Sequence, residues 1–151
     1  MKEQQYSQLI SQAKSLVSGE QDLIANMANI SALLYHNLKE VNWAGFYLFK
    51  EAQLVLGPFQ GQPACIRIPM GKGVCGTSAQ SRTVQRIADV HQFEGHIACD
   101  AASNSEIVIP LVLNDELVGV LDIDSPIFDR FDQDDEKGLV EIAKILMDSQ
   151  K

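Results

Sequence analysis

Residues 105–125, SEIVIPLVLNDELVGVLDIDS, contain two apolar runs separated by a short polar segment. The runs, residues 105–113 and 117–124, are rich in valine, isoleucine and leucine, and β-branched residues favour strands. Asn114, Asp115 and Glu116 lie between the runs and are typical of a tight turn. The segment therefore predicts an antiparallel hairpin.

The sequence before this hairpin contains four further short segments with strand character. They are residues 41–49, 53–56, 65–68 and 83–88. Residues 91–103 are rich in small residues and have no clear period, which predicts a loop with room for one helical turn. A loop of this length is uncommon in a compact domain and usually carries function.

Helical periodicity is found mainly at the two ends of the chain. Apolar residues recur at helical spacing in residues 6–17, 23–36 and 132–149, and Asp132 is the expected N-cap of the last segment. A fourth, short helix is expected over residues 74–81. Because strands and helices do not alternate strictly, the order predicts an α+β fold with an antiparallel sheet.

The composition limits the classes of function. At 151 residues the chain fits one domain, and a net charge of -8 with a pI near 4.7 leaves no basic face for nucleic acid. No apolar run is long enough to span a membrane, and we expect no signal peptide. Three cysteines are an odd set for a disulfide-stapled secreted protein. We therefore expect a cytoplasmic protein in which any disulfide is transient.

The cysteines lie close together in the sequence, at Cys65, Cys75 and Cys99. Cys65 begins an apolar strand and Cys75 begins a short helix, which are ordinary places for a small buried side chain. Cys99 differs because it lies in a polar loop. Thiols beside carboxylic acids are suited to redox chemistry that needs protons, in which a thiolate attacks, an acid delivers the proton and a second thiol resolves the intermediate.

Carboxyl groups are found near the open end of the predicted hairpin. Alternation along its second strand predicts two faces, one with Val118, Val120, Asp122 and Asp124 and the other with Leu117, Leu121 and Ile123. An apolar face that becomes acidic at its end indicates a partly buried acidic pocket. The plainer alternative is that the two aspartates only solvate the strand end.

The length of the turn decides whether Glu106 joins these aspartates. A two-residue turn would pair Ile107 with Asp122 and place Glu106 on the opposite face. A three-residue turn would pair Val108 with Asp122 and Glu106 with Asp124, which gathers three carboxyl groups. The residues by themselves leave both registers open.

We expect no metal site from these residues. The spacing C-x9-C-x23-C lacks the C-x2-C pair typical of zinc sites, and the D-x-D at Asp122 and Asp124 has no further ligand at a supporting distance in the sequence. His91 and His96 are more typical of hydrogen-bonding loop residues than of ligands.

Several long segments closely resemble the free methionine-(R)-sulfoxide reductases, which are single-domain GAF-fold enzymes. The likeness runs over residues 41–135, and the spacing of the three cysteines fits as well. The matching segments are 42–47 (NWAGFY), 57–61 (GPFQG), 64–65 (AC), 71–76 (GKGVCG), 91–93 (HQF), 96–106 (HIACDAASNSE) and 119–125 (GVLDIDS).

The resemblance implies a reductase of free L-methionine-(R)-S-oxide that is recycled by thioredoxin and holds no bound cofactor. It implies Cys99 as the nucleophile, Cys65 as the main resolving thiol and Cys75 as an auxiliary resolving thiol. A sulfenic acid on Cys99 and a disulfide between Cys65 and Cys99 would follow. A role against oxidative stress is implied with this activity.

The resemblance also implies how the substrate is held. Glu106, Asp122 and Asp124 would line the pocket, with Trp43 and Tyr47 packed around the substrate methyl group. Clustered carboxyl groups repel one another's charge, which keeps one of them protonated near neutrality. A shared pocket requires an odd-numbered loop between the hairpin strands, so we expect Glu106 to face Asp124 across such a loop.

At the level of the fold, the resemblance implies that residues 1–151 form a single GAF-like domain. Its six-stranded antiparallel sheet would carry the N- and C-terminal helices on one face, and a homodimer is expected. The competing hypothesis is a GAF module that binds a small ligand and signals without catalysis.

Overall fold

A computed structural model describes residues 1–95 and 102–151, in which the predicted hairpin lies inside a six-stranded sheet. The hairpin consists of β5 (Ser105–Leu113) and β6 (Glu116–Ser125). The other strands are β1 (Trp43–Lys50), β2 (Gln53–Gly61), β3 (Arg67–Pro69) and β4 (Gln85–Ile87). The strand order is β3-β2-β1-β6-β5-β4 and every neighbouring pair is antiparallel, so the predicted fold class is confirmed.

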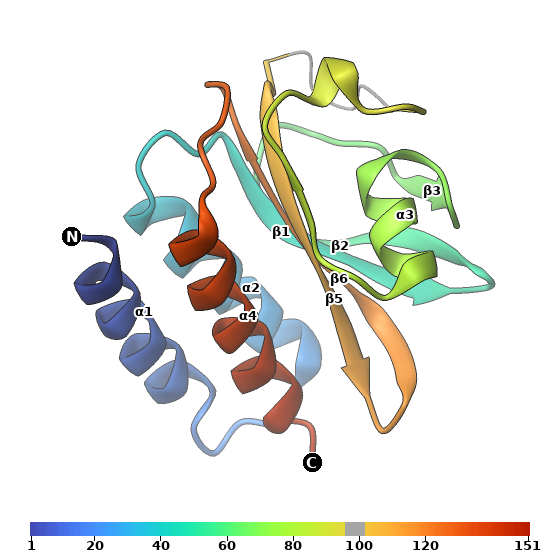
Figure 1. The fold of residues 1–151 in the computed structure, drawn as a ribbon. Coiled ribbons are helices and arrows are strands. Elements are labelled where there is room, and N and C mark those ends of the chain that lie inside the picture. Colours follow the sequence, from blue (N-terminus) through green and yellow to red (C-terminus); the bar gives the residue numbers. More distant parts are fainter. Residues whose placement is uncertain (96–101) are drawn as a thin grey trace.

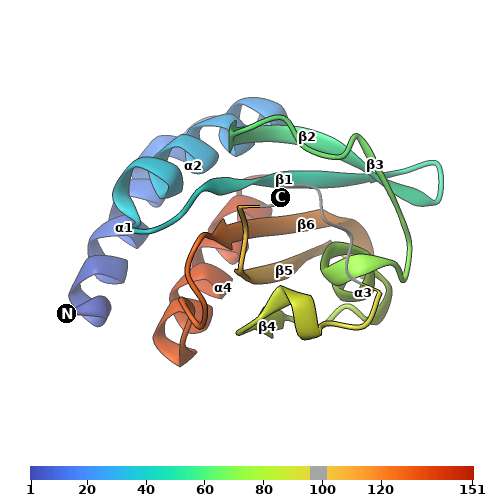
Figure 2. The ribbon, with the colours of Figure 1, turned by 90° about the horizontal axis from the view of Figure 1, so that it is seen from above.

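Three long helices cover one face of this sheet, as Figure 1 shows. They are α1 (Lys2–Val17), α2 (Leu23–Asn37) and α4 (Gln133–Asp148). Asp132 is the N-cap of α4, as predicted, and its side chain accepts hydrogen bonds from the backbone N–H groups of Asp134 and Asp135. Seen from above, the three helices lie along the same side of the curved sheet (Figure 2). The N- and C-terminal helices therefore share one face, as expected.

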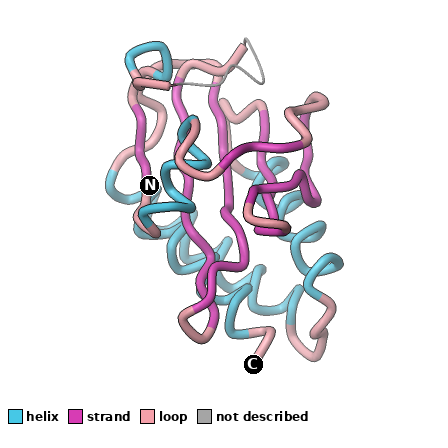
Figure 3. Tube along the Cα trace, turned by 90° about the vertical axis from the view of Figure 1, so that its right-hand side faces the viewer, coloured by secondary structure: helices cyan, strands magenta, loops and turns pink. Residues whose placement is uncertain are grey.

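The opposite face carries the short helix α3 (Gly73–Ser81), which lies in front of the strands in Figure 3. The side chains of β1 alternate between the two faces. Ala44, Phe46 and Leu48 pack into the core under the long helices, whereas Trp43 and Tyr47 pack into a second core under α3. A three-residue 3-10 helix, Val90–Gln92, overlaps the start of the predicted loop before the hairpin.

The bounds of β2 and β3 differ from the prediction in an informative way. β2 continues beyond Leu56 because the residues at Gly57 and Pro58 form an irregularity, where Gly45 pairs with Phe59 but Tyr47 pairs with Leu56. Proline lacks a ladder donor and is tolerated at such bulges, so it does not end the strand here. β3 begins at Arg67 rather than at the predicted residue 65.

The hairpin pairs Glu106 with Asp124, as predicted, but its loop and register differ from the prediction. Its loop has two residues, Asn114 and Asp115, both with positive φ, and not an odd number. The register then shifts by one residue between Leu111 and Val112, because β6 has an extra residue opposite Leu111. The predicted pairing of Glu106 with Asp124 is confirmed, but the predicted loop length was wrong.

The same bulge corrects the predicted faces of the first part of β6. Val118 packs against the core under the long helices and Leu117 against the core under α3, the reverse of the prediction. Beyond the bulge the predicted alternation holds, since Val120 faces α3 while Leu121 and Ile123 face the long helices. An extra residue in one strand inverts the faces on one side of it.

Within residues 1–95 and 102–151, no helix is long and apolar enough to cross a membrane.

Candidate active site

The three predicted carboxyl groups lie on the face of the sheet that carries α3. Asp124 pairs with Glu106 on β5 and with Trp43 on β1. Two residues earlier, Asp122 pairs with Val108 on β5 and with Gly45 on β1. Because side chains in paired positions share a face, Glu106, Asp122 and Asp124 are brought together as the prediction required.

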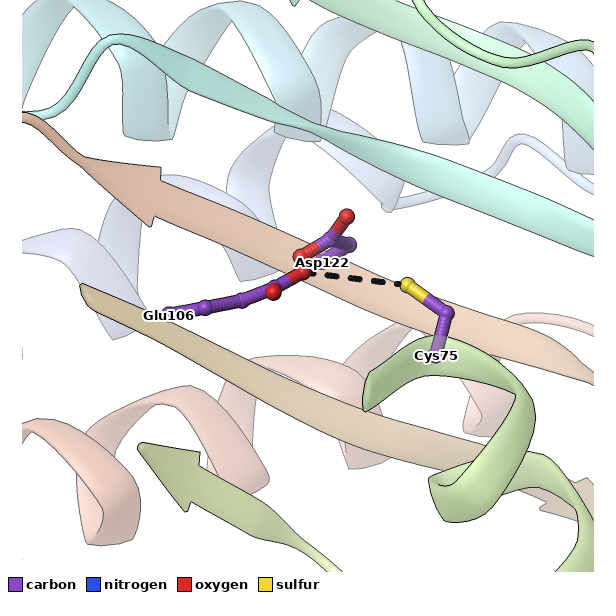
Figure 4. A group of neighbouring side chains, drawn as sticks. All are labelled: Cys75, Glu106 and Asp122. Carbon is purple, nitrogen blue, oxygen red and sulfur yellow. Dashed lines mark hydrogen bonds between the residues drawn. The ribbon is translucent and has the colours of Figure 1, made fainter. Parts of the chain in front are cut away.

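Cys75 approaches these carboxyl groups from the opposite direction. It is the third residue of α3, and its Sγ donates a hydrogen bond to Oε2 of Glu106 at 3.9 Å. One donor atom each from Cys75, Glu106 and Asp122 lies within 4.8 Å of the others. Figure 4 shows the three side chains converging from α3, β5 and β6. We call Cys75, Glu106, Asp122 and Asp124 the acidic cluster.

Burial controls the protonation of the acidic cluster. Cys75 and Asp122 are each 5% exposed and Glu106 is 8% exposed. Loss of water raises the pKa of Glu106 well above its usual value, and the charge of Asp122 adds to this effect. Burial, followed by the charge of Asp124, likewise raises the pKa of Asp122. Glu106 and Asp122 therefore hold protons that exposed carboxyl groups would release.

The Cys75 thiol is governed by the same environment. Burial is the largest cause that raises its pKa, and the charges of Asp122 and Glu106 act in the same direction. A thiol with a raised pKa is a poor nucleophile, because the thiolate is the reactive form. Cys75 is thus a proton-holding neighbour of the two carboxyl groups.

Aromatic side chains form a wall beside the acidic cluster. Trp43 stacks on Tyr47 with ring centroids 5.9 Å apart and on Phe59 at 5.1 Å. The indole Nε1 of Trp43 donates to the carbonyl of Gln62 at 3.1 Å, and the Tyr47 hydroxyl donates to the carbonyl of Cys65 at 2.9 Å. These bonds hold the two predicted substrate-binding rings in place beside Cys65.

Phe59 is the member of this wall that the sequence did not single out. The predicted strand over residues 53–56 ends before Gly57 and Pro58, so Phe59 lies outside it. In the structure Phe59 belongs to β2 and pairs with Gly45. A Cβ on Gly45 would lie 2.2 Å from that of Phe59, so the close approach needs glycine. The aromatic side chain at position 59 was the available signal.

The two cysteines among the described residues differ in state. Cys65 is disulfide-bonded, whereas Cys75 is a free thiol. Cys99, the predicted nucleophile, lies outside the described residues, as does His96. The described residues on either side are anchored, since Gly73 N donates to Gly95 O at 3.1 Å and Asn104 N donates to Ser125 O at 2.8 Å. Gly95 therefore lies at the start of α3, and Asn104 lies at the end of β6.

The chain matches the GAF domain family over residues 22–148. It is 57% identical over 138 residues to the free methionine-R-sulfoxide reductase of Escherichia coli, a match that covers 91% of this chain and 84% of that protein. It is 60% identical over 147 residues to the protein YtsP of Bacillus subtilis, with 96% and 90% covered.

A solved structure supports the same relationship. The fRMsr of Staphylococcus aureus in complex with its substrate matches this chain with a TM-score of 0.93 at 54% sequence identity. The match covers 97% of this chain and 95% of that one. The match in fold thus extends over almost the whole chain.

Proposed function

Because the chain belongs to the free methionine-R-sulfoxide reductase family of GAF-domain proteins, we propose that it reduces free L-methionine-(R)-S-oxide to L-methionine. The observation that carries this proposal is the acidic cluster beneath α3. Tyr47 packs in the same core under α3, and its hydroxyl donates a hydrogen bond to the carbonyl of disulfide-bonded Cys65. Buried acids next to a redox-active cysteine meet the two needs of sulfoxide reduction, a proton and an electron pair.

The acidic cluster would supply the proton. A sulfoxide oxygen is a poor leaving group until it is protonated, so an acid that is still protonated near neutral pH is required. Glu106 and Asp122 have raised pKa values because they are buried and lie close to other carboxyl groups. We assign proton delivery to Glu106 and Asp124 and place Asp122 at the substrate.

The thiols would supply the electron pair. The Cys99 sulfur attacks the sulfoxide sulfur, the oxygen ends on Cys99 as a sulfenic acid, and the sulfur of methionine is reduced by two electrons. The Cys65 thiol then attacks the sulfenic sulfur, water leaves and a disulfide forms. Support for Cys65 as the resolving thiol comes from its disulfide-bonded state, and the buried, high-pKa thiol of Cys75 is suited at most to an auxiliary role.

Recognition of the free amino acid would use charge. The ionised members of the acidic cluster can bind the α-ammonium group, which a methionine inside a protein lacks. Trp43 and Tyr47, each 2% exposed and stacked on one another, would pack around the methyl group. We propose thioredoxin as the reductant of the disulfide, since its potential is low enough to restore both thiols. A cytoplasmic homodimer remains our expectation.

The test is NADPH consumption in the presence of thioredoxin and thioredoxin reductase, with each epimer of free methionine sulfoxide and with a peptide that contains methionine sulfoxide. We expect turnover with the free R epimer alone. Turnover with the peptide would contradict the assignment of the ammonium group to the acidic cluster. Tight binding of the sulfoxide without turnover would instead favour the signalling GAF module.

A further inference from the structure

Cys75, Glu106 and Asp122 form a group of potential metal ligands that no local spacing in the sequence revealed. One ligand atom from each lies within 4.8 Å of the other two, and all three residues are buried. In a tetrahedral zinc site with bonds of about 2.0–2.3 Å, neighbouring ligand atoms are roughly 3.3–3.6 Å apart. The Cys75 Sγ already lies 3.9 Å from Oε2 of Glu106, so small side-chain movements suffice.

A second observation concerns Asp122 alone. The residue is only 5% exposed and its side chain has hydrogen bonds within the acidic cluster, but its buried Oδ1 atom has no hydrogen-bond partner among the described residues. Asp122 lies on the α3 face of β6, and its carboxyl group lies beside that of Glu106, near the Cys75 thiol (Figure 4). Buried carboxylate oxygens normally have a partner, and a bound cation is one way to provide it.

The charges around this group also favour a cation. None of the ion pairs formed by the described residues involves Glu106 or Asp122. Buried anionic groups are costly unless they are paired or coordinate a metal. A divalent cation would offset the charges of one thiolate and two carboxylates, leaving the group with a single net negative charge.

We propose that Cys75, Glu106 and Asp122 bind a divalent cation of the zinc class. The thiolate excludes magnesium and calcium, which prefer oxygen ligands throughout, and two carboxylates with one thiolate suit zinc or cadmium. Binding forms a metal–sulfur bond and releases the thiol proton, together with any proton that the carboxyl groups hold. The fourth position of a tetrahedral site is left for water.

Binding at this position has a consequence for catalysis that rests on the proposed function. A cation held by Glu106 and Asp122 occupies the part of the acidic cluster where, under the proposed function, Asp122 meets the substrate and Glu106 delivers the proton. Zinc and free methionine sulfoxide should therefore compete, and metal binding itself does not depend on whether the protein is a reductase.

The experiment titrates zinc chloride and cadmium chloride into protein that retains the Cys65 disulfide and has Cys75 as its free thiol. We expect one cation per chain, proton release, and an ultraviolet thiolate-to-cadmium charge-transfer band. Cys75→Ser should abolish this band and weaken binding by more than about 100-fold, since even residues that only support a metal ligand cost about 10–100-fold when changed. The affinity for the metal should decrease as the pH is lowered, because protons compete for the ligands.

Matched variants keep the outcome decisive. Asp122→Asn should weaken cadmium binding by at least about tenfold while leaving the charge-transfer band at saturation. Glu116→Gln removes an exposed carboxyl group from the same strand and should change nothing. A Cys75→Ser protein that melts normally and binds cadmium as tightly as the wild type overturns the proposal, as does equal weakening by Glu116→Gln. Zinc binding without sulfoxide reduction would remove the proposed function and leave this site standing.

Discussion

The carboxyl groups of the acidic cluster show how burial changes the chemistry of a single residue. Glu106 and Asp122 have raised pKa values chiefly because they have lost water, and neighbouring charges add to the effect. Glu116, on the same hairpin, is exposed to solvent. The position of a side chain in the fold, rather than its type, makes it suitable as a proton donor.

We predict that Glu106→Gln or Asp124→Asn slows reduction of free methionine-(R)-sulfoxide by about 10²–10⁴-fold, the usual cost of losing a general acid. The amide keeps the shape of the side chain but has no proton to give at this step. Initial rates under saturating thioredoxin measure the effect, with Glu116→Gln as the control. Wild-type rates in both cluster variants would show that neither carboxyl group delivers the proton.

The cysteines should separate by role. We predict that Cys99→Ser abolishes turnover and that Cys65→Ser permits one reduction per chain before it stalls, because the sulfenic acid can no longer be resolved. Cys75→Ser should lose less, since the wild-type thiol is buried and held protonated. The measurement is the amount of methionine formed per chain without reductant. A stoichiometric burst from Cys99→Ser would reverse the assignment.

The acidic cluster should also make folding stability depend on pH. Glu106 and Asp122 have ordinary pKa values of about 4.5 and 3.8 in the unfolded chain, whereas the folded state keeps their protons to higher pH. The folded state therefore binds more protons above pH 4.5, and the free energy of unfolding falls as pH rises through this range. Its contribution is fully present below the unfolded values.

We predict that the double variant Glu106→Gln/Asp122→Asn flattens this dependence and is more stable than the wild type at high pH. Urea unfolding from roughly pH 4.5 to pH 8 measures it, because the slope reports the difference in bound protons between the two states. An equal slope in wild type and variant would show that these two groups do not keep their protons in the folded state.

Among the elements, the hairpin of β5 and β6 decides whether the acids meet. Its two-residue loop alone would place Glu106 on the wrong face, and the extra residue of β6 near Val118 restores the pairing with Asp124. Val118 and Gly119 together oppose Leu111, after which the ladder is regular through Ser125.

We predict that deletion of Val118 keeps Glu106 paired with Asp124, because Gly119 alone then opposes Leu111 in a regular ladder. The loss should be less than about 3 kcal/mol of stability, the upper value for burying one such side chain. Deletion of Val112 on the facing strand is the matched control, since it shifts the acids out of register. Urea unfolding and reductase assays compare the two, and equal damage from both deletions would contradict this account.

At the scale of the whole molecule, the first and last helices are joined by one buried carboxylate. Asp135 is 1% exposed and accepts hydrogen bonds from the Tyr6 hydroxyl at 2.7 Å and from Lys2 Nζ at 2.6 Å. Arg130 Nη1 donates to it at 3.3 Å. These contacts hold α1 against α4 on the face of the sheet opposite to the acidic cluster.

We predict that Asp135→Asn lowers the free energy of unfolding by about 3 kcal/mol, because it removes the buried negative charge and leaves the cationic side chains around it without their partner. Tyr6→Phe should cost less, about 1–3 kcal/mol, because it removes only one hydrogen bond to the same carboxylate. The rate of sulfoxide reduction should be unchanged in both, as neither residue contacts the acidic cluster. A loss of activity larger than the loss of folded protein would show coupling between the two faces.

The sequence by itself determined the elements of this protein and the candidate chemistry. Residue periods of two and 3.6 are local properties, so the strands, the helices and the N-cap Asp132 were predictable from side-chain type and spacing. Long matching segments, such as GVLDIDS at residues 119–125, were enough to indicate the family.

Tertiary structure decided which residues meet. The loop length and the bulge of the hairpin are not encoded by a simple period, and together they place Glu106 opposite Asp124. Cys75 is separated from Glu106 by 31 positions and reaches it only because α3 packs on the sheet. The raised pKa values follow from that packing, since a carboxyl group loses its water only when distant parts of the chain close over it.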